Sequence, residues 1–201
     1  MKDRIAFVII LLFSLCFIGT SYAQQRGIEV KPSRRGDTAE ITVNGKPFTT
    51  YMDKINCLEI GKPVFFPIYN SNGTIVTRGF PLIQGIEGEN EDHPHHTGAF
   101  FTYGDITAGW VKQLNFWACR SKGERIRTVK IRDYKSGEDC GSLTTVALWE
   151  APQTGPILEQ TQKATFRYDS KSKSGSAVKN SSSSSILTIR STRNVLTCLR
   201  K

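Results

Sequence analysis

AEITVNGKPFTTY, residues 39–51, contains the clearest strand and turn signals in the chain. Its first five residues alternate apolar and polar side chains, as a half-buried strand does. Asn44-Gly45 follows, and this pair favours a two-residue turn because both residues tolerate a positive φ. The stretch therefore predicts a β-hairpin near the start of the fold.

Five further segments have the composition of short strands, rich in β-branched and aromatic residues and bounded by Gly, Pro, Asn or Ser. They cover residues 64–69, 99–103, 126–132, 143–149 and 164–168. Beyond the N-terminal segment, no stretch sustains a helical period for three turns. We therefore expect an all-β fold, an antiparallel β-sandwich, in one domain over residues 24–176.

The N-terminal residues 1–23 predict export. Two basic residues precede an apolar run over 5–18, and the small residues Ser21 and Ala23 match a signal-peptide cleavage site. The run is shorter than the roughly 20 residues of a membrane-spanning helix. We expect a mature protein that begins at Gln24, is periplasmic or extracellular, and has no transmembrane anchor after cleavage.

Four cysteines follow the expected cleavage point: Cys57, Cys119, Cys140 and Cys198. Export permits disulfides, and Cys119 and Cys140 flank a segment that could fold back on itself. Isolated thiols are an equal alternative. There is no C-x-x-C pair, so the cysteines do not indicate a metal site. The disulfide connectivity does not follow from their spacing.

The net charge of +9 is concentrated at the C-terminal end. Residues 24–162 contain 16 basic and 16 acidic residues, whereas residues 163–201 contain nine basic residues and Asp169 alone. A nucleic-acid surface needs its positive charge spread over a folded domain, so we do not expect a nucleic-acid partner. Five consecutive serines at 181–185 lie in the same segment, and residues 177–201 are predicted to form a disordered basic tail.

All three histidines of the chain occur in Asp92-His93-Pro94-His95-His96. Pro94 cannot lie inside a helix, and it favours extended geometry at His93. In an extended segment His93 and His95 would share a face and His96 would point the other way. Because imidazole acts as acid, base or metal ligand near neutral pH, this segment is the candidate functional centre, on or beside a strand that faces a concave surface.

The motifs around the histidines come in a specific order. They are GKPVFFPI at 61–68, TRGFP at 77–81, DHPHH at 92–96, FF and GD within 100–105, and FW at 116–117. In this order the sequence resembles the secreted bacterial family labelled "methane oxygenase PmoA" over about residues 28–168. The resemblance implies a large β-sandwich of the galactose-mutarotase kind, in bacteria that degrade complex polysaccharides. We treat the oxygenase label as a name, because the membrane enzyme that shares it is built on several transmembrane helices.

The sequence also departs from the pattern of that family. Thr97 stands where the family usually has an arginine or a similar polar residue, and Tyr103 stands where it usually has a histidine before Gly-Asp. The family continues with more strands beyond the position of Lys201. We therefore expect a truncated or frameshifted member with an incomplete sandwich, the alternative being a natural flexible tail.

A carbohydrate ligand is the first functional hypothesis. His93, His95 or His96 would act as acid or base on a sugar, with Asp92 or Asp105 orienting an imidazole. The expected substrate-binding residues are Arg78, Tyr103, Asp105 and Trp117, with the aromatic rings stacking on pyranose faces. Whether a sugar is turned over is open.

Two other classes remain. One is a glycan-binding module without catalysis. The other is a metal-dependent oxidase or oxygenase, in which His93 and His95 hold a divalent iron or copper ion with Asp92 or Glu91 as carboxylate ligand.

Two charged features have alternatives of their own. The acidic residues between 87 and 92 form a solvated loop or a calcium site. Arg78 binds a uronic acid or makes a structural ion pair.

Overall fold

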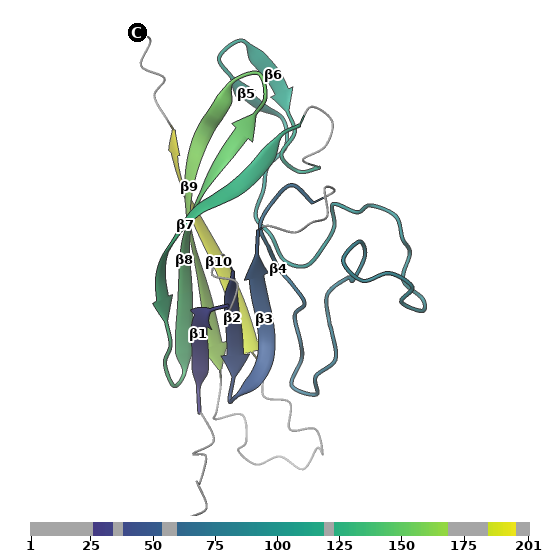
Figure 1. Ribbon diagram of the computed structural model, residues 1–201, viewed down its shortest axis with the longest axis vertical. Coiled ribbons are helices and arrows are strands. Elements are labelled where there is room, and N and C mark those ends of the chain that lie inside the picture. Colours follow the sequence, from purple (N-terminus) through teal and green to yellow (C-terminus); the bar gives the residue numbers. More distant parts are fainter. Residues whose placement is uncertain (1–25, 34–37, 54–59, 119–122, 169–184, 196–201) are drawn as a thin grey trace, which may run out of the picture.

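The structure is a computed structural model that describes residues 26–33, 38–53, 60–118, 123–168 and 185–195. These residues form strands in three antiparallel sheets and contain no helix (Figure 1). One sheet has the order β1-β2-β3-β4, the second has the order β10-β9-β8-β7, and the third is the β5-β6 hairpin. The predicted all-β fold is confirmed, and the two larger sheets pack as a β-sandwich-like pair.

The first sheet contains the predicted hairpin. Its strands are β1 (Ile28–Pro32), β2 (Ala39–Val43), β3 (Lys46–Met52) and β4 (Val64–Phe65). Asn44 and Gly45 connect β2 to β3 with φ values of 51° and 75°, as a two-residue turn requires. The sequence pattern over 39–51 therefore identified both strands and their turn.

The second sheet consists of long strands. They are β7 (Arg125–Lys135), β8 (Cys140–Ala151), β9 (Gly155–Tyr168) and β10 (Ser185–Val195). The predicted segments 126–132, 143–149 and 164–168 lie within β7, β8 and β9. The small third sheet pairs β5 (Ile106–Ala108) with β6 (Val111–Leu114).

Aromatic side chains fill the space between the two larger sheets. The Phe166 ring meets Phe48 and Phe65 edge-on, with centroids 6.2 and 5.9 Å apart. Such pairs contribute about 0.5–1.5 kcal/mol beyond the burial of their area. The Tyr51 hydroxyl is hydrogen-bonded to the Thr128 hydroxyl at 2.6 Å, and burial raises the pKa of Tyr51 to about 12. This contact ties β3 to β7.

A second core lies beneath the β5-β6 hairpin. Phe116 packs against Trp149 with ring centroids 4.9 Å apart, and both side chains are fully buried. The Trp149 indole donates a hydrogen bond of 2.6 Å to the side-chain oxygen of Gln160. The buried N–H is thereby satisfied, as burial of a tryptophan requires.

Two predicted strands are shorter in the structure or absent from it. Of residues 64–69 only Val64–Phe65 form a strand, since Pro67 has no amide hydrogen to continue the ladder. Residues 99–103 form no strand. Only Ala99 pairs there, exchanging backbone hydrogen bonds of 2.8 and 3.0 Å with Phe65.

The expectation of a disordered tail is wrong for part of residues 177–201, because Ser185–Val195 form β10. This strand pairs with β9 along its whole length, which satisfies backbone groups that a free tail would leave to water. The run ILTI at 186–189 has strand-forming composition, but the adjacent serines favoured a prediction of disorder for the whole segment.

Some predictions fall outside the described residues. These include the signal peptide over 1–23 and the cysteines Cys57, Cys119 and Cys198; Cys140 is an exposed free thiol at the start of β8. In the part of the chain that the structure describes, no helix is long and apolar enough to cross a bilayer.

Candidate functional site

The histidines lie in the long connection between β4 and β5, which extends to one side of the sheets (Figure 1). They do not lie on a strand, and the predicted extended geometry is wrong. His93 has a φ of 41°, and the His96 amide donates a hydrogen bond of 2.8 Å to the His93 carbonyl. This turn reverses the chain, so the rule of alternating faces does not apply to it.

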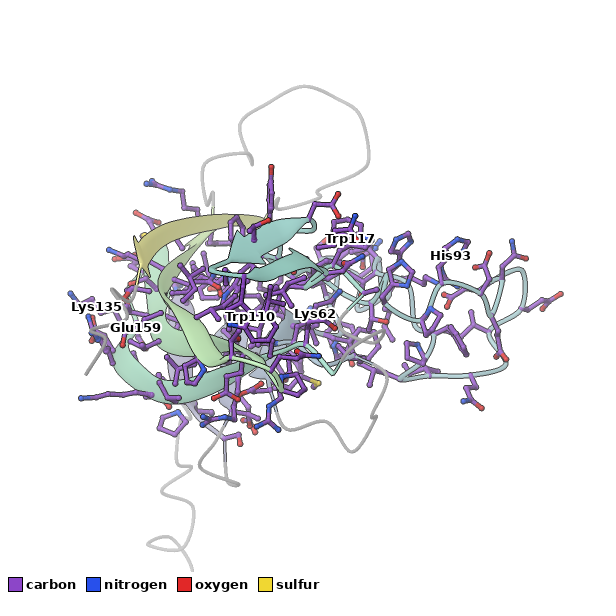
Figure 2. All side chains as sticks on the ribbon, turned by 90° about the horizontal axis from the view of Figure 1, so that it is seen from above. Lys62, His93, Trp110, Trp117, Lys135 and Glu159 are labelled. Carbon is purple, nitrogen blue, oxygen red and sulfur yellow. The ribbon has the colours of Figure 1, made fainter. Side chains whose placement is uncertain are left out.

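The turn brings the three imidazoles together instead of separating them. His93 and His96 are stacked with centroids 5.2 Å apart, and His95 meets His96 edge-on at 4.3 Å. The rings of His95 and His96 also face the Trp117 indole edge-on, at 6.4 and 5.6 Å. We call His95, His96 and Trp117 the histidine–tryptophan surface; its indole is 43% exposed (Figure 2).

A buried lysine supports Trp117. Lys62 is 1% exposed, and its ammonium donates a hydrogen bond of 2.5 Å to the Trp117 carbonyl. The same ammonium lies 3.8 Å from the centroid of the Phe100 ring, which in turn meets Trp117 edge-on at 5.7 Å. A cation over an aromatic face is attracted by the ring quadrupole. Lys62 thus fixes both the backbone and the ring environment of Trp117.

Asp92 connects Arg78 to His93. One Asp92 carboxylate oxygen lies 2.7 Å from an Arg78 guanidinium nitrogen, and the other lies 2.8 Å from Nδ1 of His93. The hydrogen bond from Arg78, followed by that from His93, holds the pKa of Asp92 below its usual range. Arg78 also donates to the backbone carbonyls of Asn90 and Asp92. The ion-pair alternative therefore describes Arg78 in this structure.

The acidic residues before the histidines shape the loop. Both carboxylate oxygens of Glu89 accept hydrogen bonds from the Gly79 amide, and one also accepts from the Phe80 amide. These bonds hold the pKa of Glu89 below its ordinary value. Glu91 accepts a hydrogen bond of 2.6 Å from the Gly85 amide. Two carboxylates of the proposed calcium cluster are thus bound to backbone amides.

Thr97 and Gly98 fasten the end of the histidine segment to the body of the protein. The Thr97 hydroxyl is fully buried and lies 2.8 Å from the Phe80 carbonyl, to which it donates. A side chain on Gly98 would meet the Phe65 carbonyl at 2.5 Å, and its φ is 59°. Glycine is required there because the backbone approaches β4 so closely.

The surroundings of His96 shift its pKa. Desolvation is the largest cause, and Coulombic interactions with His93, Arg78 and Lys62 add to it, so the pKa of His96 lies below its usual value. His96 is therefore neutral at pH 7, with one ring nitrogen as donor and the other as acceptor.

The metal hypothesis needs a third ligand beside His93 and His95. In the part of the chain that is described, no group of three or more His, Cys, Asp or Glu side chains is placed to hold a metal ion. The imidazoles stack and meet edge-on, and Asp92 is engaged by Arg78 and His93. The further ligand that a His93 and His95 pair needs is not among these residues.

Two predicted binding residues lie on the approach to β5. Tyr103 is 55% exposed. Asp105 is exposed with a φ of 52°, and it makes no hydrogen bond or ion pair with other described residues. The structure therefore unites the histidines, Asp92, Arg78 and Trp117, and leaves Asp105 apart from them.

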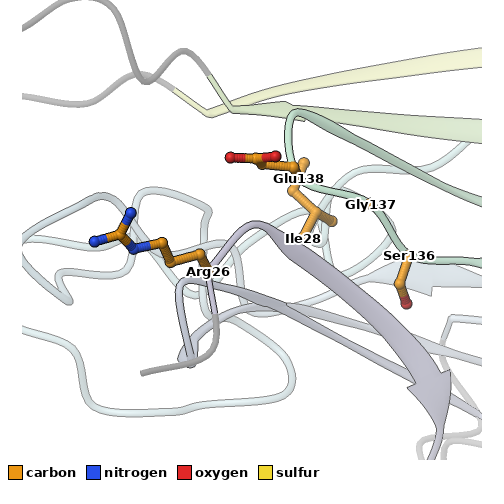
Figure 3. Close-up of a pocket in the computed structure, with 5 residues that line it drawn as sticks. All are labelled: Arg26, Ile28, Ser136, Gly137 and Glu138. Atoms are coloured by element: carbon orange, nitrogen blue, oxygen red, sulfur yellow. The ribbon is translucent and has the colours of Figure 1, made fainter. Parts of the chain in front are cut away.

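Two surface cavities lie elsewhere, and the histidines line neither. One has a volume of about 500 Å³ between the start of β1 and the β7–β8 turn, where the side chains of Arg26 and Glu138 flank it (Figure 3). The other, of about 450 Å³, is lined by residues around the β8–β9 turn, including Arg125 and Glu150. The concave surface expected at the histidines is not one of these two cavities.

A family model matches residues 38–195, from the first predicted hairpin to the end of β10. The chain belongs to the DUF6807 family. DUF6807 is described as a family of unknown function. No curated protein and no solved structure matches the chain. The DUF6807 match includes the whole histidine segment, Trp117 and β10, so both the site and the last strand belong to the matched region.

Sequence reasoning missed several residues that build the site. Lys62 stands out in the sequence only as part of a motif, and because lysine is rarely fully buried its burial could not be predicted. Glu89 was counted as one of a solvated acidic cluster. Thr97 was considered only as a departure from a family pattern. Their roles depend on backbone atoms that lie far away in the sequence, and composition does not reveal such partners.

Proposed function

We propose that this DUF6807 protein is exported and binds carbohydrate at the histidine–tryptophan surface. The observation that carries the proposal is the half-exposed indole of Trp117, flanked by the edges of His95 and His96. A pyranose ring has an apolar face of C–H groups and a rim of hydroxyls. Exposed aromatic rings beside hydrogen-bonding groups are suited to both parts.

Imidazole nitrogens supply the polar half of such a site. Neutral His96 both donates and accepts, which matches a sugar hydroxyl that does the same. Asp92 fixes the orientation of the His93 ring through Nδ1, as carboxylates do for functional imidazoles. The polar groups are thus positioned before any ligand arrives, and a preorganised site loses less free energy on binding.

Binding is better supported than hydrolysis. Glycoside hydrolysis generally uses two carboxyl groups on either side of the scissile bond. Near the histidines, Glu89 and Glu91 accept backbone hydrogen bonds, and Asp92 is held by Arg78 and His93. These three carboxylates shape the loop and orient a side chain, and none of the three stands opposite a second carboxyl group in the contacts described for the site.

Two sequence observations complete the proposal. The signal-peptide pattern of residues 1–23 would place the surface outside the cytoplasm, where polysaccharide fragments occur. The resemblance to the PmoA-labelled family points to the same setting. N-terminal sequencing of secreted protein should begin at Gln24, whereas an intact Met1 in cytoplasmic protein would contradict export.

A panel of neutral and acidic oligosaccharides, measured by isothermal titration calorimetry on the purified protein, tests the binding site. For the best ligand, Trp117→Ala and His95→Ala should each weaken binding at least about tenfold, since hot-spot aromatic residues contribute about 1–2 kcal/mol or more. Trp110→Ala is the matched control, because Trp110 is 79% exposed on the β5–β6 turn (Figure 2). Equal affinity of all three variants would contradict the proposal.

A further inference from the structure

The outer face of the second sheet is strongly basic. Leu143, Ala164 and Phe166 of β8 and β9 point into the core, so their neighbours in the strands point outward. β7, β8 and β9 together contain seven basic and three acidic residues, a net charge of +4. The other residues of 24–168 include 11 basic and 13 acidic residues, a net charge of −2, so the positive charge is gathered on these three strands.

The strand register places the cations on one side. Lys130 of β7 lies opposite Val146 of β8, which in turn lies opposite Thr161 of β9. Lys163 of β9 lies opposite Thr144 of β8. Arg167, at the end of β9, pairs with Cys140. Two irregularities in β7, at 128–130 and 131–133, keep Lys130 and Lys135 opposite outward positions of β8. We call Lys130, Lys135, Lys163 and Arg167 the cationic face.

Most of this charge is not neutralised by carboxylates. Lys130, Lys163 and Arg167 are exposed and make no ion pair with any described residue. Lys135 lies 3.2 Å from Asp133, and this pair is solvent-exposed. Exposed ion pairs contribute little free energy, so Lys135 is able to exchange its partner for a ligand anion.

Hydroxyl groups lie between the cations. Thr144 of β8 and Thr165 of β9 are partly exposed, and Thr144 pairs with Lys163. Adjacent strands are about 4.8 Å apart, so the Thr144 residue is one strand spacing from Lys163. Val146 is 4% exposed although it lies on this outer side, as expected where long basic side chains lie over the sheet.

We propose that the cationic face binds an anionic polysaccharide, with uronate carboxylates against the lysines and arginine and sugar hydroxyls against threonine. A repeating polyanion matches a sheet face on which cations recur along and across the strands. β8 and β9 have 12 and 14 residues, so the face extends over several sugar units along the strands.

Other polyanions match the face less well. Single-stranded nucleic acid requires exposed aromatic rings for base stacking, and Tyr134 and Tyr168 are instead packed against the core. A membrane surface requires several apolar anchors, and Val129 is the one large hydrophobic residue of β7 to β9 that is prominently exposed. A second copy would offer the acidic loop over 87–92, but Glu89, Glu91 and Asp92 are already engaged.

This surface is separate from the histidine–tryptophan surface. Lys135 and Glu159, on β7 and β9, lie on the opposite side of the molecule from His93 (Figure 2). The inference therefore does not depend on the proposed function, and it would survive if the histidines bound no sugar.

Affinity for polygalacturonate, measured by biolayer interferometry at about 0.05 M and about 0.3 M NaCl, tests the inference, since screening weakens exposed charge contacts over this range. The triple variant Lys130→Gln, Lys163→Gln, Arg167→Gln should bind about tenfold more weakly at low salt and depend less on salt, because three charge contacts are lost. The control Lys31→Gln, Lys46→Gln, Arg26→Gln removes the same charges from exposed sites outside the face and should bind like the parent protein.

Three further ligands, namely dextran, single-stranded DNA and anionic vesicles, test which partner binds the cationic face. Dextran, a neutral glucan, should not bind at the cationic face, so any response to it should be the same in the parent protein and in the cationic triple variant. No polygalacturonate binding by the parent protein, or equal loss in both triple variants, would overturn the inference. Tighter face-dependent binding of single-stranded DNA or of vesicles containing phosphatidylglycerol would also overturn it, in favour of that partner.

Discussion

The two larger sheets and the connection between β4 and β5 are held in place by different means. The sheets combine continuous backbone ladders with an aromatic core around Phe65 and Phe166. In the connection, single side chains such as Glu89 and Thr97 bind backbone groups elsewhere in the same connection, and Lys62, just before β4, binds the Trp117 carbonyl beside it. Stability should therefore depend mainly on the sheets, whereas the geometry of the candidate site should depend on a few polar contacts.

The largest expected effect is on the sheets. Trp149→Ala should lower the free energy of unfolding by about 3–5 kcal/mol, because the indole is fully buried and would leave a cavity next to Phe116. Urea denaturation followed by circular dichroism measures the loss. Trp110→Ala, an exposed tryptophan of the β5–β6 turn, should change the value by less than about 0.5 kcal/mol. Similar losses in both variants would refute the assignment of the core.

The buried contact between Lys62 and Trp117, beside the connection, comes next. Lys62→Met retains the bulk of the side chain but leaves the Trp117 carbonyl without its donor, which should cost about 1–3 kcal/mol. The emission of Trp117 should shift, and carbohydrate affinity should fall with it. Lys46→Met, at an exposed position of β3, serves as the control. Unchanged fluorescence and affinity in the Lys62 variant would show that Trp117 is positioned by other groups.

Glu89 should have a smaller and more local effect. Glu89→Gln weakens the bonds to the Gly79 and Phe80 amides and should destabilise the loop by about 1–2 kcal/mol, as expected for bonds to a charged acceptor. Hydrogen exchange should speed up at those two amides while the amides of β8 and β9 remain protected. Glu87→Gln, on the same loop but exposed, should leave exchange unchanged. Faster exchange throughout the sheets would contradict a local role.

The pH dependence gives the smallest expected change. The pKa of His96 is lowered, so below the ordinary value of about 6.5 the unfolded chain takes up a proton that the folded chain resists. This contribution to stability is therefore present above pH 6.5 and is lost as the pH falls below it. Carbohydrate affinity should fall a few-fold between about pH 7 and pH 5, and calorimetry on His96→Gln should show a flatter profile. An identical profile would exclude His96 as the titrating group.

The sheets could be predicted well from the sequence because local signals agree with the fold. Alternation in 39–43 and the Asn44-Gly45 turn identified β2 and β3 directly. β7, β8 and β9 were recognised only in part, since charged and small residues on their outer face dilute the strand composition. β10 was missed because serines adjoin its ILTI run and the pairing with β9 is not a local property.

The candidate site could be predicted in composition but not in geometry. The clustering of the histidines and the inclusion of Asp92, Arg78 and Trp117 came from the sequence, and the structure brings these residues together. The positive φ of His93 and the burial of Lys62 did not, because both depend on contacts with residues distant in the chain. Residues on an irregular connection have no period from which their direction can be inferred.

Histidine side-chain NMR provides the most direct measurement of the central claim, that carbohydrate binds at the histidine–tryptophan surface. The chain has three histidines, all within residues 93–96, so every imidazole signal of a histidine-labelled sample reports on this site. Titration with the best oligosaccharide of the calorimetric panel should shift the ring signals of His95 and His96 in a saturable way, with the same affinity as calorimetry. Unchanged imidazole signals at a ligand concentration that saturates the calorimetric response would show that carbohydrate binds elsewhere and would contradict the account.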